Sequence, residues 1–215
     1  MNFQILGKII KVNLKNNFLI HLMAAALILF SVPFIMSISA LNETQAARPV
    51  EWILSLVGMI FLTPIFYPEQ DENICDVVRS KKMDYLGVCI IRVIYSVVFL
   101  ALVCGGFTYA LYLCESEVTL RHFLGGFASA LFLGTVGFLG AGISKNVIAG
   151  YMTALLYYMA NVAMKKQLGI FYLFSMTAGE GLHEKFENKY LLILTSVLLM
   201  IFVFLYKRLT EQKKQ

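Results

Sequence analysis

The chain has 215 residues, of which 59% are hydrophobic and 14% charged, and its formal net charge is +5 at pH 7. A mean hydropathy of +0.75 excludes an ordinary soluble domain, because so many apolar side chains would cover the exterior as well as the core. The basic residues stand at the ends of apolar runs, where they meet lipid headgroups, so the positive charge does not indicate nucleic-acid binding. We expect an integral membrane protein with about six spans of about 20 residues each and no large soluble domain.

The N-terminal residues 1–16 predict an amphipathic helix that lies in the membrane interface. In helical spacing, Lys8, Lys11 and Lys15 share one face, and apolar side chains share another. The basic face would meet anionic headgroups while the apolar face is buried in lipid. A first span follows, with Pro33 as an expected kink.

Six apolar stretches have the length and composition of transmembrane helices. Aromatic residues stand near both ends of the second and the sixth stretch, as is common at membrane interfaces. Arg92 lies two turns into the third, where we expect its long side chain to snorkel to the cytoplasmic headgroups; a polar contact inside a pathway is the alternative. The expected spans are 18–40, 50–67, 85–113, 123–143, 147–164 and 190–206.

The fourth span carries a stripe of small residues. Gly126, Ala130 and Gly134 recur every four residues, so they share one side of a helix. Small side chains allow two backbones to approach closely in lipid, and the stripe therefore predicts a helix-packing surface.

Between the fifth and sixth spans, residues 168–176 are apolar but cover about half the length that a crossing needs. We expect this segment to dip into the membrane or lie flat as a half-buried hairpin. Non-helical backbone at membrane depth needs protein or water to cover it, so the segment should pack against the other helices near one mouth of the bundle.

An acidic cluster follows that segment. Its spacing could align carboxylates with an imidazole on one helical face, but a di-iron bundle needs a second Glu-x-x-His pair from another helix. We interpret the cluster as an amphipathic turn of an outer loop, with a metal or substrate contact as the alternative. Its members are Glu180, His183, Glu184 and Glu187.

The distribution of basic residues predicts the orientation. An even number of spans puts both termini on one side, where eleven lysines and arginines gather against six on the other. Cytoplasmic loops carry an excess of lysine and arginine. We therefore expect a multi-pass protein of the cell membrane with both termini in the cytoplasm.

The stretch from Tyr67 to Tyr85 holds eight charged residues in nineteen positions, between two apolar spans. Glu69, Asp71 and Glu72 stand near its start and Arg79, Lys81 and Lys82 near its end, which suits the dipole of a short helix. Ile74, Val77 and Val78 share one face of that helix. On the expected cytoplasmic side, a charged helix with an apolar stripe favours docking on a soluble partner; a solvated connector packed on headgroups is the alternative.

The order of these elements resembles that of ABC-2 type permeases, the membrane subunits of bacterial ATP-binding cassette exporters. In that family an amphipathic elbow helix precedes six spans, a cytoplasmic coupling helix follows the second span, and a half-buried hairpin separates the fifth and sixth. Glu69 and the run from Asp76 to Ser80 resemble the coupling segment. The resemblance and the apolar stripe together assign to ATPase docking the residues Glu69, Glu72, Ile74, Asp76, Val77, Val78, Arg79, Lys81 and Lys82.

The expected fold is therefore an all-α integral membrane protein, a single transmembrane domain over residues 1–215. It has six transmembrane helices, an N-terminal interfacial helix, a cytoplasmic coupling helix and a half-buried hairpin before the last span. The sequence has no GxxxxGK[ST] loop to hold a nucleotide, so any ATP would be used by a partner subunit. We expect no catalytic, cofactor or metal site in this chain.

As the resemblance implies, the expected partners are an ATP-binding cassette ATPase subunit, a second permease subunit that is identical or homologous, and the lipid bilayer. The substrate would be amphiphilic, since the spans offer few charges to recognise a polar solute. One alternative is the substrate-capture subunit of an energy-coupled importer, which would need polar residues around a ligand pocket. A membrane-embedded enzyme is the other.

Overall fold

The computed structural model describes residues 18–70, 85–177 and 186–212. These residues form an all-helical structure and contain no strand. The expected interfacial helix at 1–16 lies outside the described residues. The α-helices are α2 (Leu19–Ile35), α3 (Glu43–Leu62), α5 (Tyr85–Leu113), α6 (Leu120–Ser144), α7 (Val147–Met164) and α8 (Phe186–Gln212), and the 3-10 helices are η2 (Thr63–Gln70) and η3 (Lys165–Phe171).

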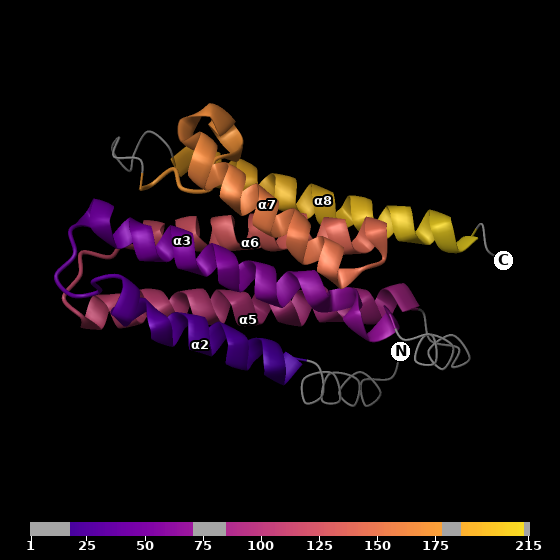
Figure 1. Cartoon of the computed structure of the whole chain (residues 1–215), viewed down its shortest axis with the longest axis horizontal. Coiled ribbons are helices and arrows are strands. Elements are labelled where there is room, and N and C mark those ends of the chain that lie inside the picture. The colour runs from indigo at the N-terminus through magenta and orange to yellow at the C-terminus, as the bar shows by residue number, and fades with distance from the viewer. Residues whose placement is uncertain (1–17, 71–84, 178–185, 213–215) are drawn as a thin grey trace.

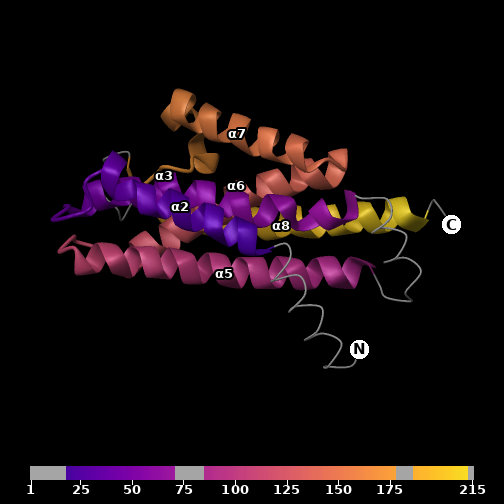
Figure 2. The same ribbon diagram turned by 60° about the horizontal axis from the view of Figure 1, so that its bottom comes forward.

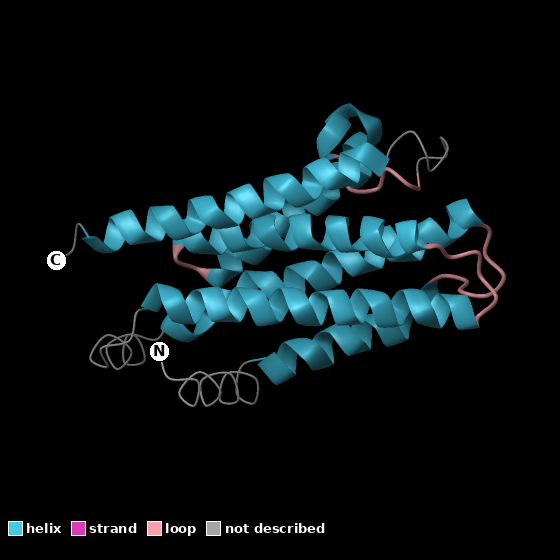
Figure 3. Ribbon diagram, turned by 180° about the vertical axis from the view of Figure 1, so that it is seen from behind, coloured by secondary structure: helices cyan, strands magenta, loops and turns pink. Residues whose placement is uncertain are grey.

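Successive α-helices run in opposite directions along an elongated bundle (Figures 1 and 3). We call one end of the bundle the terminal end, because η2 ends there, α5 begins there and α8 ends there (Figure 1). The opposite end, where α2 meets α3, where α5 meets α6 and where η3 lies, is the loop end. Figure 2 shows α5 and α7 on opposite faces of the bundle.

Five helical stretches of the described chain are long and apolar enough to cross a membrane: α3 with the start of η2, and α5, α6, α7 and α8. The apolar helix α2 has 17 residues and is shorter than these. It ends at Ile35, two residues beyond Pro33, where Met36 adopts an extended backbone. The described part of the chain is thus all-helical, with five candidate membrane-spanning helices.

Some helix bounds differ from the expected spans for local chemical reasons. Helices α5 and α7 cover the same residues as the spans expected at 85–113 and 147–164. Helix α3 instead begins at Glu43, because the Asn42 backbone N–H is capped by the side chain of Gln45 at 3.4 Å. It gives way to 3-10 geometry at Thr63, next to Pro64, which has no N–H to donate to the α-helical ladder.

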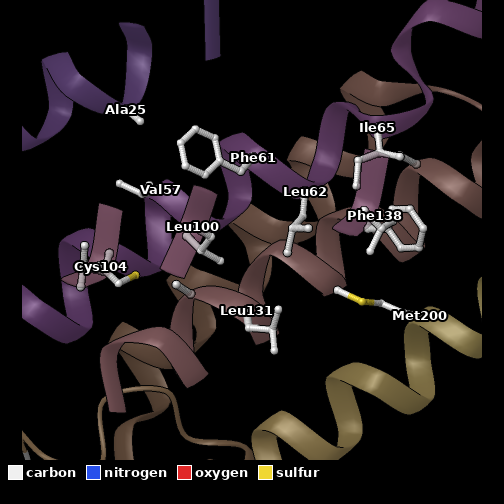
Figure 4. Packing of buried hydrophobic residues seen from close by; sticks show 14 of the residues in the cluster. Ala25, Val57, Phe61, Leu62, Ile65, Leu100, Cys104, Leu131, Phe138 and Met200 are labelled. Atoms are coloured by element: carbon white, nitrogen blue, oxygen red, sulfur yellow. The ribbon is translucent and has the colours of Figure 1, made fainter. Parts of the chain in front are cut away.

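Helices α3 and α6 form the centre of the bundle. In each, 72% of the most apolar stretch is buried, against 33% in α5 and 22% in α7 and α8. Phe61 of α3 and Leu131 and Phe138 of α6 belong to one cluster of buried side chains (Figure 4), and all three are at most 5% exposed. The outer faces of the peripheral helices carry exposed apolar side chains such as Leu102 and Leu156, as lipid contact requires.

The close approach of α3 to α6 depends on glycine, and we call this contact the α3–α6 seam. A Cβ atom on Gly58 would overlap the backbone of Ala130, and one on Gly134 would overlap the carbonyl oxygen of Gly58. On Gly126 it would lie 2.5 Å from Cγ1 of Val50. The structure therefore places the small-residue stripe of α6 against α3.

The side chain of Arg92 does not lie where the sequence predicted it. It is 6% exposed and lies inside the bundle, where Nη1 donates to the carbonyl oxygen of Ile65 at 3.0 Å. That carbonyl lacks a 3-10 partner three residues later, because Pro68 has no N–H. The interpretation of Arg92 as a residue that snorkels to the headgroups is wrong.

Candidate functional site

A buried ion pair joins α3 to α8 near the loop end. The Nζ atom of Lys189 lies 2.6 Å from Oε1 of Glu51, and the two side chains are 1% and 0% exposed. Both residues belong to candidate membrane spans. Burying a charged side chain costs free energy unless the charge is paired, so buried charges in membrane spans often mark functional sites. This pair is therefore the candidate site.

Lys189 uses all three of its N–H groups. They donate to Glu51 Oε1 at 2.6 Å, to Oγ of Ser129 in α6 at 2.7 Å and to the carbonyl oxygen of Leu173 at 2.6 Å. An ammonium group has three donors and no acceptor, so its hydrogen-bonding capacity is filled. Lys189 lies in the first turn of α8, which is the positive end of the helix dipole, so a negatively charged partner such as Glu51 is further favoured there.

Both oxygens of the Glu51 carboxylate likewise have their hydrogen-bonding positions occupied. Besides Lys189, Oε1 accepts the backbone N–H of Met176 at 3.0 Å. Oε2 accepts the backbone N–H of Thr177 at 2.9 Å and its hydroxyl at 2.6 Å. With two acceptances on each oxygen, this carboxylate offers no open position to a ligand in the observed conformation.

These contacts hold residues 171–177, which we call the inserted segment. It begins at Phe171, the last residue of η3, and continues in turns; the backbone of η3 is kinked at Gly169. Leu173, Phe174 and Ser175 of the inserted segment are at most 2% exposed. The segment expected to form a half-buried hairpin therefore packs into the loop end of the bundle, covered by helices.

Helix α7 supplies two further anchors. Oδ1 of Asn161 accepts the backbone N–H of Leu173 at 2.8 Å, while its Nδ2 donates to the carbonyl oxygen of Tyr157 at 2.9 Å. The hydroxyl of Tyr157 donates to the carbonyl oxygen of Phe171 at 2.6 Å. Side chains from α3, α6, α7 and α8 thus satisfy backbone groups of the inserted segment, as non-helical backbone at membrane depth requires.

Helix α6 provides the surface on which the segment rests. A Cβ atom on Gly125 would overlap the sulfur of Met176, so a side chain there would displace the segment. One turn further, Oγ of Ser129 lies 2.8 Å from the carbonyl oxygen of Leu173.

Burial raises the pKa of the Tyr172 hydroxyl, and the negative charge of Glu51 adds to this increase. We call Glu51, Ser129, Asn161 and Lys189, with the inserted segment, the polar network.

The expected spans 50–67 and 190–206 put Glu51 at the start of one span and Lys189 just before another, whereas both side chains are buried within the bundle. The available signal was one acidic residue inside an expected span and one basic residue next to another, since charged residues in membrane spans usually face the protein interior and pair with one another. Periodicity gave no indication that these two residues are partners.

The residues assigned to ATPase docking lie mostly outside the described residues. Glu69 belongs to η2 at the terminal end, and positions 72–82 are not described. Of the acidic cluster, Glu187 lies exposed in the first turn of α8, and positions 180–184 are not described. In the described ranges, no group of three or more His, Cys, Asp or Glu side chains could hold a metal ion.

An open hollow of about 460 Å³ lies at the loop end, apart from the polar network. Both apolar and polar side chains line it, including one cation. The lining residues are Met36, Ser37, Ser39, Ala40, Leu41, Gln45, Arg48 and Pro49.

Comparison of the chain with protein-family models, with curated proteins and with solved structures finds no match.

Proposed function

We propose that this protein is the non-catalytic membrane permease subunit of an ATP-binding cassette transporter, which exports an amphiphilic substrate with energy from a separate ATPase subunit. The observation that supports this proposal most is that the two ends of the bundle carry different elements. The chain leaves η2 at Gln70 and re-enters α5 at Tyr85 at the terminal end, whereas the inserted segment lies at the loop end (Figure 1). This is the order of elements that the sequence shares with ABC-2 type permeases.

The filled centre of the bundle supports a dimer. Phe61, Leu62, Leu131 and Phe138 are at most 5% exposed between α3, α5, α6 and α8. A substrate path through the middle of one copy would have to displace this core, which is unfavourable because apolar interiors are close-packed. A path between two permease copies needs no such displacement, so we propose that two copies and two ATPase subunits work together.

We further propose that six helices cross the cell membrane, with α2 as the first span and the terminal end in the cytoplasm. The basic residues Lys145, Lys207 and Arg208 lie at the terminal end of α6 and α8, as cytoplasmic loops require. A cysteine at Lys214 and one at Glu187 test this orientation in intact cells, in a chain whose native cysteines are alanine. An impermeant maleimide should label Glu187→Cys; labelling of Lys214→Cys instead would refute the orientation.

The test of the function itself uses the charged stretch between η2 and α5. Burying Val77 and Val78 in an ATPase groove should contribute about 1.5 to 3 kcal/mol each, while the surrounding charges mainly set orientation and association rate. In the double variant Val77→Asp/Val78→Asp, two carboxylates would be buried without partners. We expect the tagged variant to insert normally into its native membrane and to lose co-purification of a nucleotide-binding protein.

The matched control adds the same two charges to the same stretch, off the apolar stripe. In helical spacing, Asn73 and Ser80 lie to one side of the face shared by Ile74 and the two valines. The variant Asn73→Asp/Ser80→Asp should therefore retain the ATPase. If neither the native chain nor the control retains a nucleotide-binding protein, or if the valine variant retains it fully, the proposed function is wrong.

A further inference from the structure

The Glu51–Lys189 ion pair holds the inserted segment together with Ser129, Tyr157 and Asn161. The segment has no strand partner and no helical turn of its own beyond η3. Three of its backbone groups bind the pair directly: the carbonyl oxygen of Leu173 accepts from Lys189, and the N–H groups of Met176 and Thr177 donate to Glu51. If both side chains of the pair move away from the segment, these three bonds are lost together.

The seated position of the segment also leaves buried polar atoms unsatisfied. Oγ of Ser175 and Nε1 of Trp52 are buried and have no hydrogen-bond partner in the described part of the chain. Both atoms lie near Phe174, because Ser175 follows it in the chain and the Trp52 ring packs on the Phe174 ring with centroids 5.3 Å apart. Buried donors without partners raise the free energy of a conformation, so a second position that exposes them to water would relieve part of this cost.

The glycines of the α3–α6 seam pack against the two helices of the seam. At Gly58, Gly126 and Gly134, the atoms that an added Cβ would meet first belong to α3 or α6 and not to the inserted segment. Helices α7 and α8 are peripheral, with 22% of their most apolar stretches buried. Upstream of the segment, Gly169 has a φ of +55° and open space around its Cα, so the chain there can change direction.

We propose that the Glu51–Lys189 ion pair is a conformational latch, which seats residues 171–177 in the loop end and whose opening releases this segment while the α3–α6 seam stays packed. The latch combines charge pairing with hydrogen bonds to the backbone of the segment and to the hydroxyl of Thr177.

The first experiment measures access to the segment. In a chain whose native cysteines are alanine, Ser175→Cys places a thiol at a position that is 2% exposed. We expect Glu51→Gln or Lys189→Met to increase its rate of maleimide labelling about tenfold or more, because either change strands one charge of the pair. Ser196→Ala is the matched control, since Ser196 is also buried in α8 but bonds only within its own helix.

Helical content and gel-filtration profile are measured on the same samples. Faster labelling with both properties retained supports the latch. Unchanged labelling in the charge variants overturns it, because the pair would then not seat the segment. Labelling that rises only together with loss of helical content overturns it as well, because the segment would then not be separable from the fold.

A second measurement needs no added thiol and applies if Ser175→Cys does not fold. Hydrogen exchange reports directly on the amides of Leu173, Met176 and Thr177, which donate to network side chains. In Lys189→Met these amides should exchange about tenfold faster or more, while amides of α3 and α6 around the seam keep their protection. Equal acceleration in both regions, or in neither, would refute the latch.

Discussion

The α3–α6 seam and the polar network both join helices that are distant in sequence, but by opposite means. In the seam, glycines remove side chains so that two backbones touch, and attraction comes from close van der Waals packing. In the polar network, charged and polar side chains reach out to a segment that cannot satisfy its own backbone. The seam therefore depends on shape and tolerates no added atoms, whereas the network depends on pairing and tolerates no missing partner.

The largest expected effect follows from adding volume to the seam. Gly58→Leu would force a side chain into the backbone of Ala130, and backbone cannot move aside as a flexible side chain can. We expect a loss of more than about 3 kcal/mol in the free energy of unfolding and little monodisperse protein. Gly106→Leu is the control, since a Cβ atom there meets nothing within 4 Å. A Gly58→Leu protein as stable as the control would show that the seam is not tight.

The next effect follows from removing one charge from the network. Lys189→Met strands the carboxylate of Glu51 with its remaining donors in a buried site. We expect the free energy of unfolding in detergent to fall by about 3 to 5 kcal/mol, with the protein still folded at low temperature. Denaturant titration followed by helical content measures this. A change within about 0.5 kcal/mol of the native value, the range of ordinary surface substitutions, would contradict the buried pairing.

A smaller effect is expected at the edge of the network. Asn161→Leu leaves the backbone N–H of Leu173 without its acceptor, which should lower the free energy of unfolding by about 1 to 3 kcal/mol. Thr195→Val is a fair control, because the hydroxyl of Thr195 bonds only within α8 and lies near its exposed side. If the two variants unfold at the same denaturant concentration, α7 does not anchor the inserted segment.

The same contrast explains what the sequence could reveal. The bounds of α5 and α7 agree with the apolar stretches because apolar side chains end where charged or turn-forming residues begin. The small residues of α6 were visible for a similar reason, as they repeat with the helical period. Both features are local, and local spacing suffices to find them.

The network could not be found in this way. Glu51 and Lys189 are 138 positions apart, and no spacing rule links residues on different helices. The general preference of lysine for membrane interfaces pointed away from the interior. Arg92 was misplaced for a related reason, since its depth depends on the carbonyl oxygen of Ile65, which Pro68 leaves open.

The most direct test of the polar network is a double-mutant cycle between Glu51 and Lys189. Unfolding free energies are measured for the native chain, Glu51→Gln, Lys189→Met and the double variant. Because the double variant leaves no unpaired charge, we expect it to be less destabilised than the sum of the single changes by about 2 kcal/mol or more. A coupling energy near zero would show that the two side chains do not depend on each other, and would contradict the buried ion pair on which the network rests.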